Sequence, residues 1–406
     1  MNAILVFCKE ETDEQKEEMY DLLRTAGIQI KNTFYQNVKA VSRSTYIGKG
    51  KCEEIALYLA DEQPIDTIVF STDLSVMQVR ELENIFDRQV LDRTDLILQI
   101  FMERARSAAA RLQIESAQLQ RQMNRLIGTN VHLTRQRGGV INRGAGEKQL
   151  QLDKRLIKTR IAQINKELKK LSRQRETQRT NRLRSNLPIV ALAGYTNAGK
   201  STLMNKMLSL SRRSETKQVF QEDLLFATLD TSVRIIELPY GQSFLLADTV
   251  GFLEDLPHEL VQAFHSTLED IRYASCILQI VNASSPRYMD NMKTTLETLE
   301  DIHASHIDRL VVYNQCDKTE IHHPALENGN VYISAMSSND VEFLVDQVCE
   351  QLYGPWVEEE LFVAFNDFER QQKLRAYANI LETQYEEDGM KVRFLIRQAW
   401  KKTVEM

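Results

Sequence analysis

Apolar residues along the first hundred positions follow two spacings, and each spacing predicts a different element. The short runs "AILVF", "IDTIVF" and "QVLDR" are typical of strands. Between them, "DEQKEEMYDLLRTAG" and "VMQVRELENIFD" place apolar side chains three and four residues apart, which is the period of a helix. Alternating strands and helices predict a small sheet covered by helices, so we expect an α/β domain over residues 1–105.

Helical spacing alone extends over residues 106–186. The segment "RSAAARLQIESAQLQRQMNRL" is rich in strong helix formers, with Leu112, Leu119 and Met123 at helical or heptad-like spacing. A second helix is predicted from about Glu147 to Arg184. Its apolar residues lie on one side: Leu150, Ile157, Ile161, Ile164, Leu168 and Leu171. Together the two segments predict a helical hairpin.

Two further regions complete the pattern. In "NLPIVALAGYTNAGKSTLMNKML", Pro188 breaks the preceding helix, "IVALA" is a buried type of strand, and "KSTLMNKML" begins a helix, so a third region is expected over residues 187–353. From about Gly354, "LFVAF", "NDFERQQKLRAYANILETQYEEDG" and "MKVRFLIRQAW" predict strand, helix and strand. Residues 354–406 are therefore expected to form a small α+β domain.

Charge is distributed unevenly along the chain. The 406 residues have a net charge of −6, but residues 104–186 hold 21 Lys and Arg against 5 Asp and Glu, which leaves 30 against 52 elsewhere. A solvated helix surface would explain an ordinary charge run. Because this excess of +16 extends over about 80 residues, we favour a polyanionic partner for the hairpin.

Composition excludes several classes of protein. No apolar run approaches the roughly 18 residues of a membrane helix, and "MNAILVFCKEETDEQ" lacks the basic leader and cleavage site of a signal peptide. The five cysteines are scattered, with no CxxC pair and no histidine cluster beside them, so neither disulfides nor a zinc site is indicated. We expect a cytoplasmic protein with reduced thiols, no membrane span and a monomeric state in solution.

The strongest motif is "GYTNAGKS" at residues 194–201, which matches GxxxxGK[ST] between a predicted strand and a predicted helix. Gly194 and Gly199 allow backbone amides to surround phosphates, Lys200 neutralises the β and γ oxygens, and the Ser201 hydroxyl can bind Mg²⁺. The motif predicts a P-loop nucleotide site with Mg²⁺ as its metal.

Two later segments fit the metal and the γ-phosphate. "LLADTVGF" places Asp248 at a strand end, where it can hold Mg²⁺ through water, and Gly251 where its amide can contact the γ-phosphate. Upstream, "LLFATLDTSVR" offers Thr228 as a switch hydroxyl. We therefore expect Ser201, Thr228 and Asp248 at the metal, and Lys200, Thr228 and Gly251 to act in catalysis.

Guanine is predicted by two segments near the end of the third region. In "VVYNQCD", Asn314 and Asp317 have the NxxD spacing, and the carboxylate can accept hydrogen bonds from the N1 and N2 edge of guanine. "VYISAM" supplies Ser334 and Ala335. The residues expected at GTP or GDP are Gly194, Tyr195, Thr196, Asn197, Ala198, Gly199, Lys200, Ser201, Thr202, Phe226, Ala227, Thr228, Leu229, Asp230, Asp248, Thr249, Val250, Gly251, Asn314, Gln315, Cys316, Asp317, Ser334, Ala335 and Met336.

Asn197 has two readings of equal weight. It stands at a position of the P-loop from which some GTPases coordinate a monovalent cation, so K⁺ could supply charge to the reaction. Alternatively, the side chain only braces the loop.

Glycine and arginine alternate in the predicted tip of the hairpin, "HLTRQRGGVINRGAGE". A flexible turn would need only a few residues. We expect Arg135, Arg137 and Arg143 to contact RNA phosphates or grooves. By contrast, "TYIGKGK" in the first domain is a weak signal, because two glycines before a helix mark a loop far more often than a phosphate cradle. Six histidines are interpreted as surface or core residues, not ligands: His258, His265, His303, His306, His322 and His323.

These segments together resemble the HflX GTPases of the translation-factor-related class. The resemblance covers "TYIGKGK" and "DRTDLILQIF" in the first domain, "HLTRQRGG" and "RGAGEKQL" at the hairpin, and "GYTNAGKST", "FATLD" and "DTVGF" in the nucleotide domain. It implies GTP hydrolysis, the large ribosomal subunit and its rRNA as partner, and a role in splitting or rescuing stalled ribosomes. The expected fold class is α/β multidomain: an N-terminal α/β domain, a long helical hairpin, a P-loop GTPase domain with a mixed sheet, and a small α+β C-terminal domain.

The chain departs from the family pattern at three places. Gln315 stands where NKxD has a lysine that packs over guanine, so we expect micromolar affinity with base selectivity kept. "RGAGEKQLQ" replaces a common "RGPGE" followed by Thr, which alters the hairpin tip. Phe252 follows "DTVG" where Ras-like GTPases place a water-orienting Gln, so hydrolysis without the ribosome should be slow.

Two other functions stay open at this point. The chain could be a ribosome-binding factor that uses nucleotide as a docking switch, for example to reshape the peptidyl-transferase region against an antibiotic. It could also be a GTPase of rRNA or tRNA maturation.

Overall fold

The computed structural model describes residues 1–38, 40–60, 64–105, 107–133, 145–183, 187–211, 232–249, 251 and 269–405. Contacts divide the chain into two units, the first made mainly of residues 1–177 and the second mainly of residues 178–406. Each unit is described by itself. Within the described ranges, no helix combines the length and the apolar character that crossing a lipid bilayer requires.

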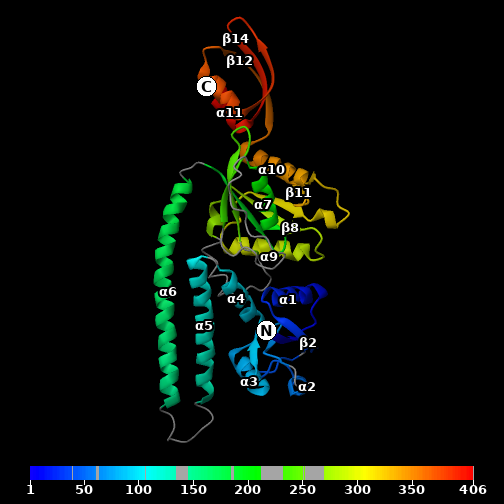
Figure 1. Ribbon diagram of the computed structural model, residues 1–406, viewed down its shortest axis with the longest axis vertical. Helices are drawn as coiled ribbons and strands as arrows, with labels where there is room; N and C mark the ends of the chain where they lie inside the picture. Colours follow the sequence, from blue (N-terminus) through cyan, green and yellow to red (C-terminus); the bar gives the residue numbers. More distant parts are fainter. Residues whose placement is uncertain are drawn as a thin grey trace. The chain divides into compact units, whose positions relative to one another are not determined.

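A parallel sheet of four strands forms the centre of the first unit (Figure 1). In sheet order the strands are β2 (Gln29–Tyr35), β1 (Asn2–Phe7), β3 (Thr67–Phe70) and β4 (Gln89–Leu91). The helices are α1 (Asp13–Thr25), α2 (Lys49–Ala60), α3 (Val76–Phe86) and α4 (Arg93–Arg104). Capping boxes at Thr12, Ser75 and Asp92 explain where α1, α3 and α4 begin, because each side chain accepts the amide hydrogen three residues ahead. The predicted α/β fold of this part is confirmed.

Two long helices follow, α5 (Ala108–Leu133) and α6 (Ala145–Leu183). They lie side by side (Figure 1), and Arg160 of α6 binds both carboxylate oxygens of Glu115 in α5, at 2.7 and 2.9 Å. Ile157 and Ile164 are buried on the predicted side of α6. Both helices reach further toward the tip than predicted, since α5 continues past Leu126 to Leu133 and α6 begins at Ala145.

The predicted apolar stripe of α5 is not its most buried face. Leu112, Leu119 and Met123 are half-buried, whereas the small residues Ala110 and Ala117 are buried with Ile114. Helix α5 packs on the helices α3 and α4, so small side chains allow the close approach. Arg121 of α5 pairs with Asp92 and Asp95 at the start of α4.

The second unit contains a mixed sheet of seven strands. In sheet order they are β10 (Ala325–Glu327), β11 (Asn330–Tyr332), β9 (Arg309–Asn314), β8 (Cys276–Asn282), β5 (Ile189–Gly194), β7 (Ser243–Asp248) and β6 (Ser232–Glu237). The two edge strands β10 and β6 run antiparallel to their neighbours, and the other pairs are parallel. The helical segments are α7 (Lys200–Leu210), η1 (Glu269–Tyr273), α9 (Tyr288–Asp301), η2 (Cys316–Lys318) and α10 (Ser338–Tyr353).

An antiparallel sheet of three strands follows in the same unit, in the order β12 (Trp356–Ala364), β14 (Gly389–Arg397) and β13 (Ala378–Tyr385). It is accompanied by α11 (Phe368–Tyr377), η3 (Gln398–Trp400) and α12 (Lys401–Glu405). The single helix predicted over "NDFERQQKLRAYANILETQYEEDG" is wrong in its second half. Helix α11 ends at Tyr377, and the following residues pair with β14 from Ala378 to Tyr385. Pairing with a distant strand satisfies their backbone groups and overrides the local helical pattern.

Candidate nucleotide-binding site

The segment between β5 and α7 has the form of a phosphate-binding loop. Strand β5 ends at Gly194 and α7 begins at Lys200. A Cβ on Gly194 would lie 2.3 Å from the carbonyl oxygen of Ile280 in the neighbouring strand β8. Gly199 has φ +87°, and a Cβ there would lie 2.4 Å from Asn314 Nδ2. Both positions therefore require glycine, as the motif predicts.

Lys200 folds back over this loop. Its ammonium donates to the carbonyl oxygens of Gly194 and Tyr195, at 2.9 and 2.8 Å. Burial lowers the pKa of Lys200 to about 8, although Asp248 acts in the opposite direction. A buried ammonium is costly unless an anion accompanies it, so this position suits a phosphate.

Ser201 and Asp248 come together at the start of α7. The Ser201 hydroxyl donates to Asp248 Oδ2 at 2.9 Å. Asp248 is the last residue of β7, which pairs with β5, so the sheet itself brings this carboxylate to the loop. Hydroxyl and carboxylate oxygens are the hard ligands that Mg²⁺ prefers, and this pair of donors fits that ion.

Gly251 also lies against the phosphate loop. A Cβ on Gly251 would lie 2.8 Å from Thr196 Cγ2 and 3.1 Å from Lys200 Nζ. Thr249 donates to the carbonyl oxygen of Leu192 at 2.6 Å, which fixes the chain just before this point. Six expected residues lie outside the described residues: Phe226, Ala227, Thr228, Leu229, Asp230 and Val250.

Asn314 of the NxxD motif forms hydrogen bonds to the phosphate loop and to the segment "VYISAM". It ends β9, and its side-chain amide donates to the carbonyl oxygen of Ala198 in the phosphate loop at 2.9 Å. Its Oδ1 accepts the backbone amide hydrogen of Ala335, also at 2.9 Å. One buried side chain thus ties the loop that would hold phosphate to the two segments that would hold the base.

Gln315 has a role that the sequence interpretation missed. Its Nε2 donates to the carbonyl oxygen of Asn197 at 3.0 Å, and its Oε1 accepts from Lys318 at 3.0 Å. Gln315 therefore braces the phosphate loop. From the sequence, the only predicted effect of Gln315 is the loss of a lysine that packs over guanine.

The remaining expected residues differ in exposure. Ala198, Cys316, Ser334 and Ala335 are buried; Tyr195, Ser201 and Thr202 are half-buried; Asn197, Asp317 and Met336 are exposed. Exposure of Asp317 in the short helix η2 leaves its carboxylate accessible to a ligand.

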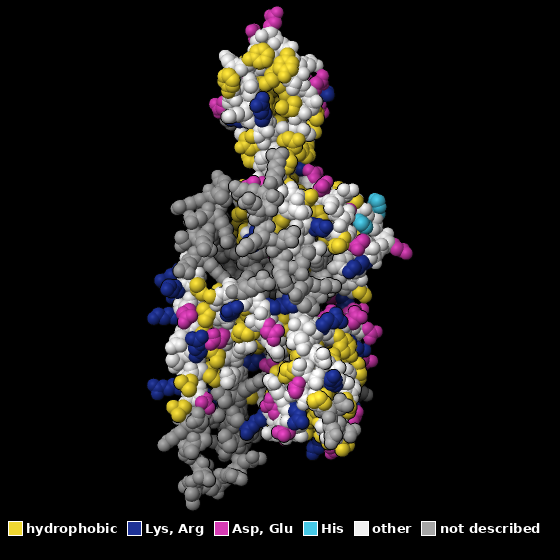
Figure 2. All heavy atoms as spheres, in the orientation of Figure 1, with side chains coloured by type: hydrophobic (Ala, Val, Ile, Leu, Met, Phe, Trp, Pro, Cys, Tyr) yellow, Lys and Arg dark blue, Asp and Glu magenta, His cyan; other side chains and the backbone are white. Residues whose placement is uncertain are grey.

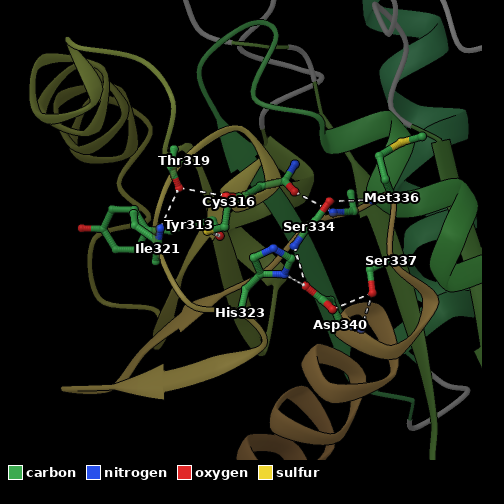
Figure 3. A network of polar contacts seen from close by, with 11 residues as sticks. Tyr313, Cys316, Thr319, Ile321, His323, Ser334, Met336, Ser337 and Asp340 are labelled. Carbon is green, nitrogen blue, oxygen red and sulfur yellow. Dashed lines mark hydrogen bonds and ion pairs between the residues drawn. The ribbon is translucent and has the colours of Figure 1, made fainter.

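Sequence reasoning also missed Asp340 and His323 (Figure 3). Asp340 is nearly buried and accepts the amide hydrogen of Ser334 at 2.8 Å. His323 Nδ1 lies 2.5 Å from the same oxygen, and because an ionised carboxylate only accepts, Nδ1 must carry the hydrogen. "SSND" contains the one available signal, a serine followed three residues later by an acid at a helix start. His303 and His306 are exposed, whereas His258 and His265 lie outside the described residues.

Basic side chains are exposed along α6 (Figure 2). They include Arg155, Lys158, Lys166, Lys169, Lys170 and Arg173. Arg135, Arg137 and Arg143 lie outside the described residues.

Three family models match in succession: GTP-binding GTPase N-terminal over residues 13–102, GTP-binding GTPase Middle Region over 104–182, and 50S ribosome-binding GTPase over 189–315. GTPase HflX of Caldanaerobacter subterraneus is 35% identical over 390 residues, which cover 96% of this chain and 89% of that protein. GTPase HflX of Escherichia coli is 35% identical, covering 95% and 91%. The chain belongs to the HflX GTPase family.

A further relative and one solved structure extend the comparison. GTPase HflX of Flavobacterium psychrophilum is 40% identical over 309 residues, covering 76% of this chain and 72% of that protein. A crystal structure of a GTP-binding protein from Sulfolobus solfataricus in complex with GDP is 21% identical, covers 87% of this chain and all of that chain, and has a TM-score of 0.46. That structural likeness is too distant to support a conclusion about this chain.

As an HflX GTPase, the protein binds GTP and GDP and hydrolyses GTP to GDP and phosphate. The resemblance seen in the sequence is confirmed, as is the fold class. The middle-region match covers 104–182, which is the basic stretch that forms α5 and α6.

Proposed function

We propose that this HflX GTPase binds the large ribosomal subunit through its basic helical hairpin and couples GTP hydrolysis to the splitting or rescue of stalled ribosomes. The observation that carries the proposal is the excess of 21 Lys and Arg over 5 Asp and Glu in residues 104–186, which continue directly into the nucleotide domain. Phosphate backbones attract such a segment. The match over 189–315 to a model described as 50S ribosome-binding GTPase supports the same partner.

The proposal divides the chain into four parts by function. Residues 1–105 form the N-terminal domain, 106–186 the rRNA-binding hairpin, 187–353 the GTPase domain and 354–406 the C-terminal domain. The predicted cytoplasmic location and monomeric state belong to this proposal as well.

Roles within the nucleotide site follow from position. Backbone amides of Gly194–Thr202 and the ammonium of Lys200 hold the phosphates, because both face the same loop. Ser201 and Asp248, with Thr228, hold Mg²⁺, which when bound neutralises charge on the phosphate oxygens. Gly251 contacts the γ-phosphate from beside Lys200.

Guanine recognition is assigned to three segments. Asp317 accepts from the N1 and N2 groups of guanine. Asn314 aligns the base segments with the phosphate loop through its bonds to Ala198 and Ala335. Gln315 braces the backbone of Asn197. Because no lysine stem covers the base at this position, the affinity for GDP should be micromolar.

Ribosome dissociation on a sucrose gradient tests the main proposal. With GTP, purified protein should convert 70S particles to subunits, and with a non-hydrolysable analogue it should stay bound to the large subunit. Binding without dissociation or stimulated hydrolysis would favour the docking switch that protects a drug-bound peptidyl-transferase region. Crosslinks confined to precursor rRNA or to tRNA would favour maturation.

The hairpin assignment has its own test. Neutralising Arg135, Arg137 and Arg143 should weaken co-sedimentation with large subunits and flatten its salt dependence, because fewer counterions are released on binding. The matched control removes three exposed arginines of the first domain: Arg24, Arg43 and Arg80. If both triple variants pellet like the wild type over the whole salt series, the hairpin tip does not bind rRNA.

Potassium dependence decides between the two readings of Asn197. The bond from Gln315 reaches the backbone carbonyl oxygen of Asn197, and the exposed side chain of Asn197 is accessible to a cation. We propose K⁺ as the physiological cation. Ribosome-stimulated hydrolysis should then be faster in potassium than in sodium, and equal rates would leave only the bracing role.

A further inference from the structure

Asp340 receives three hydrogen bonds beside the predicted base side of the site (Figure 3). Its Oδ2 accepts the Ser334 amide hydrogen at 2.8 Å and lies 2.5 Å from His323 Nδ1. Its Oδ1 accepts the Ser337 hydroxyl hydrogen at 2.6 Å. Burial alone would raise the pKa of Asp340, but the bonds from Ser337, Ser334 and His323 outweigh it and lower that pKa. The carboxylate is therefore ionised and firmly held.

The two carboxylate oxygens serve different structures. Oδ1 belongs to the start of α10, where Ser337 caps the helix by accepting the amide hydrogen of Asp340. Oδ2 faces away from the cap, toward Ser334 and His323. The helix cap accounts for the hydrogen bond of Oδ1 but not for the two partners of Oδ2.

One partner of Oδ2, Ser334, is linked through the next residue to the phosphate loop. Ser334 precedes Ala335, whose amide hydrogen binds Asn314 Oδ1, and Asn314 in turn binds Ala198 of the phosphate loop. The Ser334 hydroxyl accepts the amide hydrogen of Met336 at 3.2 Å. A continuous series of hydrogen bonds thus connects Asp340 with the turn Ser334–Met336 and with the phosphate loop.

We propose that Asp340, held in place by His323, is a positioning residue for the guanine base. Through the Ser334 amide hydrogen that it accepts, Asp340 fixes the backbone of the turn Ser334–Met336 on the side of the site assigned to guanine. This inference rests on the proposed assignment of this turn to GTP. It adds two residues that no nucleotide motif contains.

The deciding comparison is Asp340→Ala against Ser337→Ala. Both variants disturb the start of α10, but only Asp340→Ala frees the Ser334 amide. Asp340→Ala should raise the Kd for GDP and the KM for GTP by about tenfold, which corresponds to about 1.4 kcal/mol, with kcat at saturating GTP unchanged. Ser337→Ala should change both constants by less than about twofold, since a cap contributes to stability more than to a neighbouring turn. Should Asp340→Ala not fold, the same comparison is made with Asp340→Asn.

The preference for GTP over ATP provides a readout that a purely structural role would not move. The wild type should prefer GTP to ATP, and Asp340→Ala should lose part of that preference while Ser337→Ala keeps it. His323→Ala should share the loss in part. His323→Asn should restore it, because the asparagine amide nitrogen takes the place of Nδ1.

Two outcomes distinguish the positioning role of Asp340 from the assignment of the site to guanine nucleotides. If the wild type binds ATP as tightly as GTP, the guanine assignment itself fails. If the wild type prefers GTP and Asp340→Ala behaves like Ser337→Ala, only the positioning role of Asp340 is overturned.

Discussion

Two buried aspartates mark strand ends in the two units, and they serve different purposes. Asp92 follows β4 in the first unit, and Asp248 ends β7 in the second; both are fully buried. Asp92 pairs with Arg121, a cation that the chain itself supplies from α5. Asp248 instead accepts from Ser201, at the edge of a loop with a buried lysine. A carboxylate at a strand end becomes part of the packing where a helix brings a cation, and becomes a candidate ligand where it faces a phosphate loop.

Two segments that contain glycine and lysine, one in each unit, also differ in structure. In "IGKGK", helix α2 begins at Lys49, which is exposed, and a Cβ on Gly50 would meet nothing within 4 Å. In "NAGKS", Lys200 is buried and Gly199 has the positive φ that glycine tolerates. The same residue types therefore form a phosphate cradle only when the backbone turns through a left-handed residue and directs the lysine inward.

The largest effect should come from the first aspartate. In alkaline buffer, where Asp92 is ionised, Arg121→Ala leaves its carboxylate buried without a cation. This should lower the free energy of unfolding of the first unit by about 3–5 kcal/mol. The control Arg160→Ala removes a half-exposed pair with Glu115 and should cost less than about 1 kcal/mol.

Urea unfolding separates the two units, because both tryptophans, Trp356 and Trp400, lie in the second. Arg121→Ala should shift the unfolding of helices followed by circular dichroism and leave tryptophan fluorescence in place. Equal stability of the two arginine variants would show that Asp92 does not depend on Arg121.

Lys200→Ala should have the next largest effect, on nucleotide binding. Loss of a charged hydrogen-bonding group should weaken GDP binding by roughly a hundredfold. Lys49→Ala, at the corresponding place in the first domain, should bind GDP like the wild type. Isothermal titration with GDP measures both, and a comparable loss in the two variants would place a second nucleotide contact in the first domain.

Gly199→Ala should reduce affinity more modestly. A left-handed residue with a Cβ costs about 1–2 kcal/mol, and the new atom would push Asn314 away from Ala198. We expect a loss of roughly tenfold in GDP affinity. Gly50→Ala is the control: it should leave GDP affinity unchanged and stabilise α2 by up to about 1 kcal/mol. Wild-type affinity in Gly199→Ala would contradict the requirement for glycine.

The pH dependence of stability should show a smaller, graded effect. Burial and the neighbouring Asp95 raise the pKa of Asp92 to about 7, with Asp73 acting in the same direction and Arg121 opposing. The folded state then holds a proton that the unfolded state releases near pH 4. Stability from this group is complete below about pH 4 and is lost as pH rises toward 7, by at most about 1.4 kcal/mol per pH unit. Asp92→Asn should flatten this part of the curve, and an unchanged curve would contradict the raised pKa.

The sequence by itself determined the parts of the site that depend on neighbouring residues. A strand, two glycines, a lysine and a helix start suffice for a phosphate loop, since the backbone turn and the first helical amides are local properties. Gly194, Gly199, Lys200 and Ser201 accordingly lie where the motif predicts. The predicted strands and helices of the first region, β1, α1, β3, α3 and β4, follow from their periodicity for the same reason.

Only the tertiary structure decided which distant residues meet. Asn314 reaches Ala198 and Ala335 because parallel strands bring their carboxyl ends to one edge of the sheet. Asp340 reaches His323 because the first turn of α10 packs beside the segment that precedes β10. Pairing with β14 makes residues 378–385 a strand, although their local pattern favoured a helix. Hydrogen bonds between residues far apart in the chain depend on the register of the sheet, which no local spacing specifies.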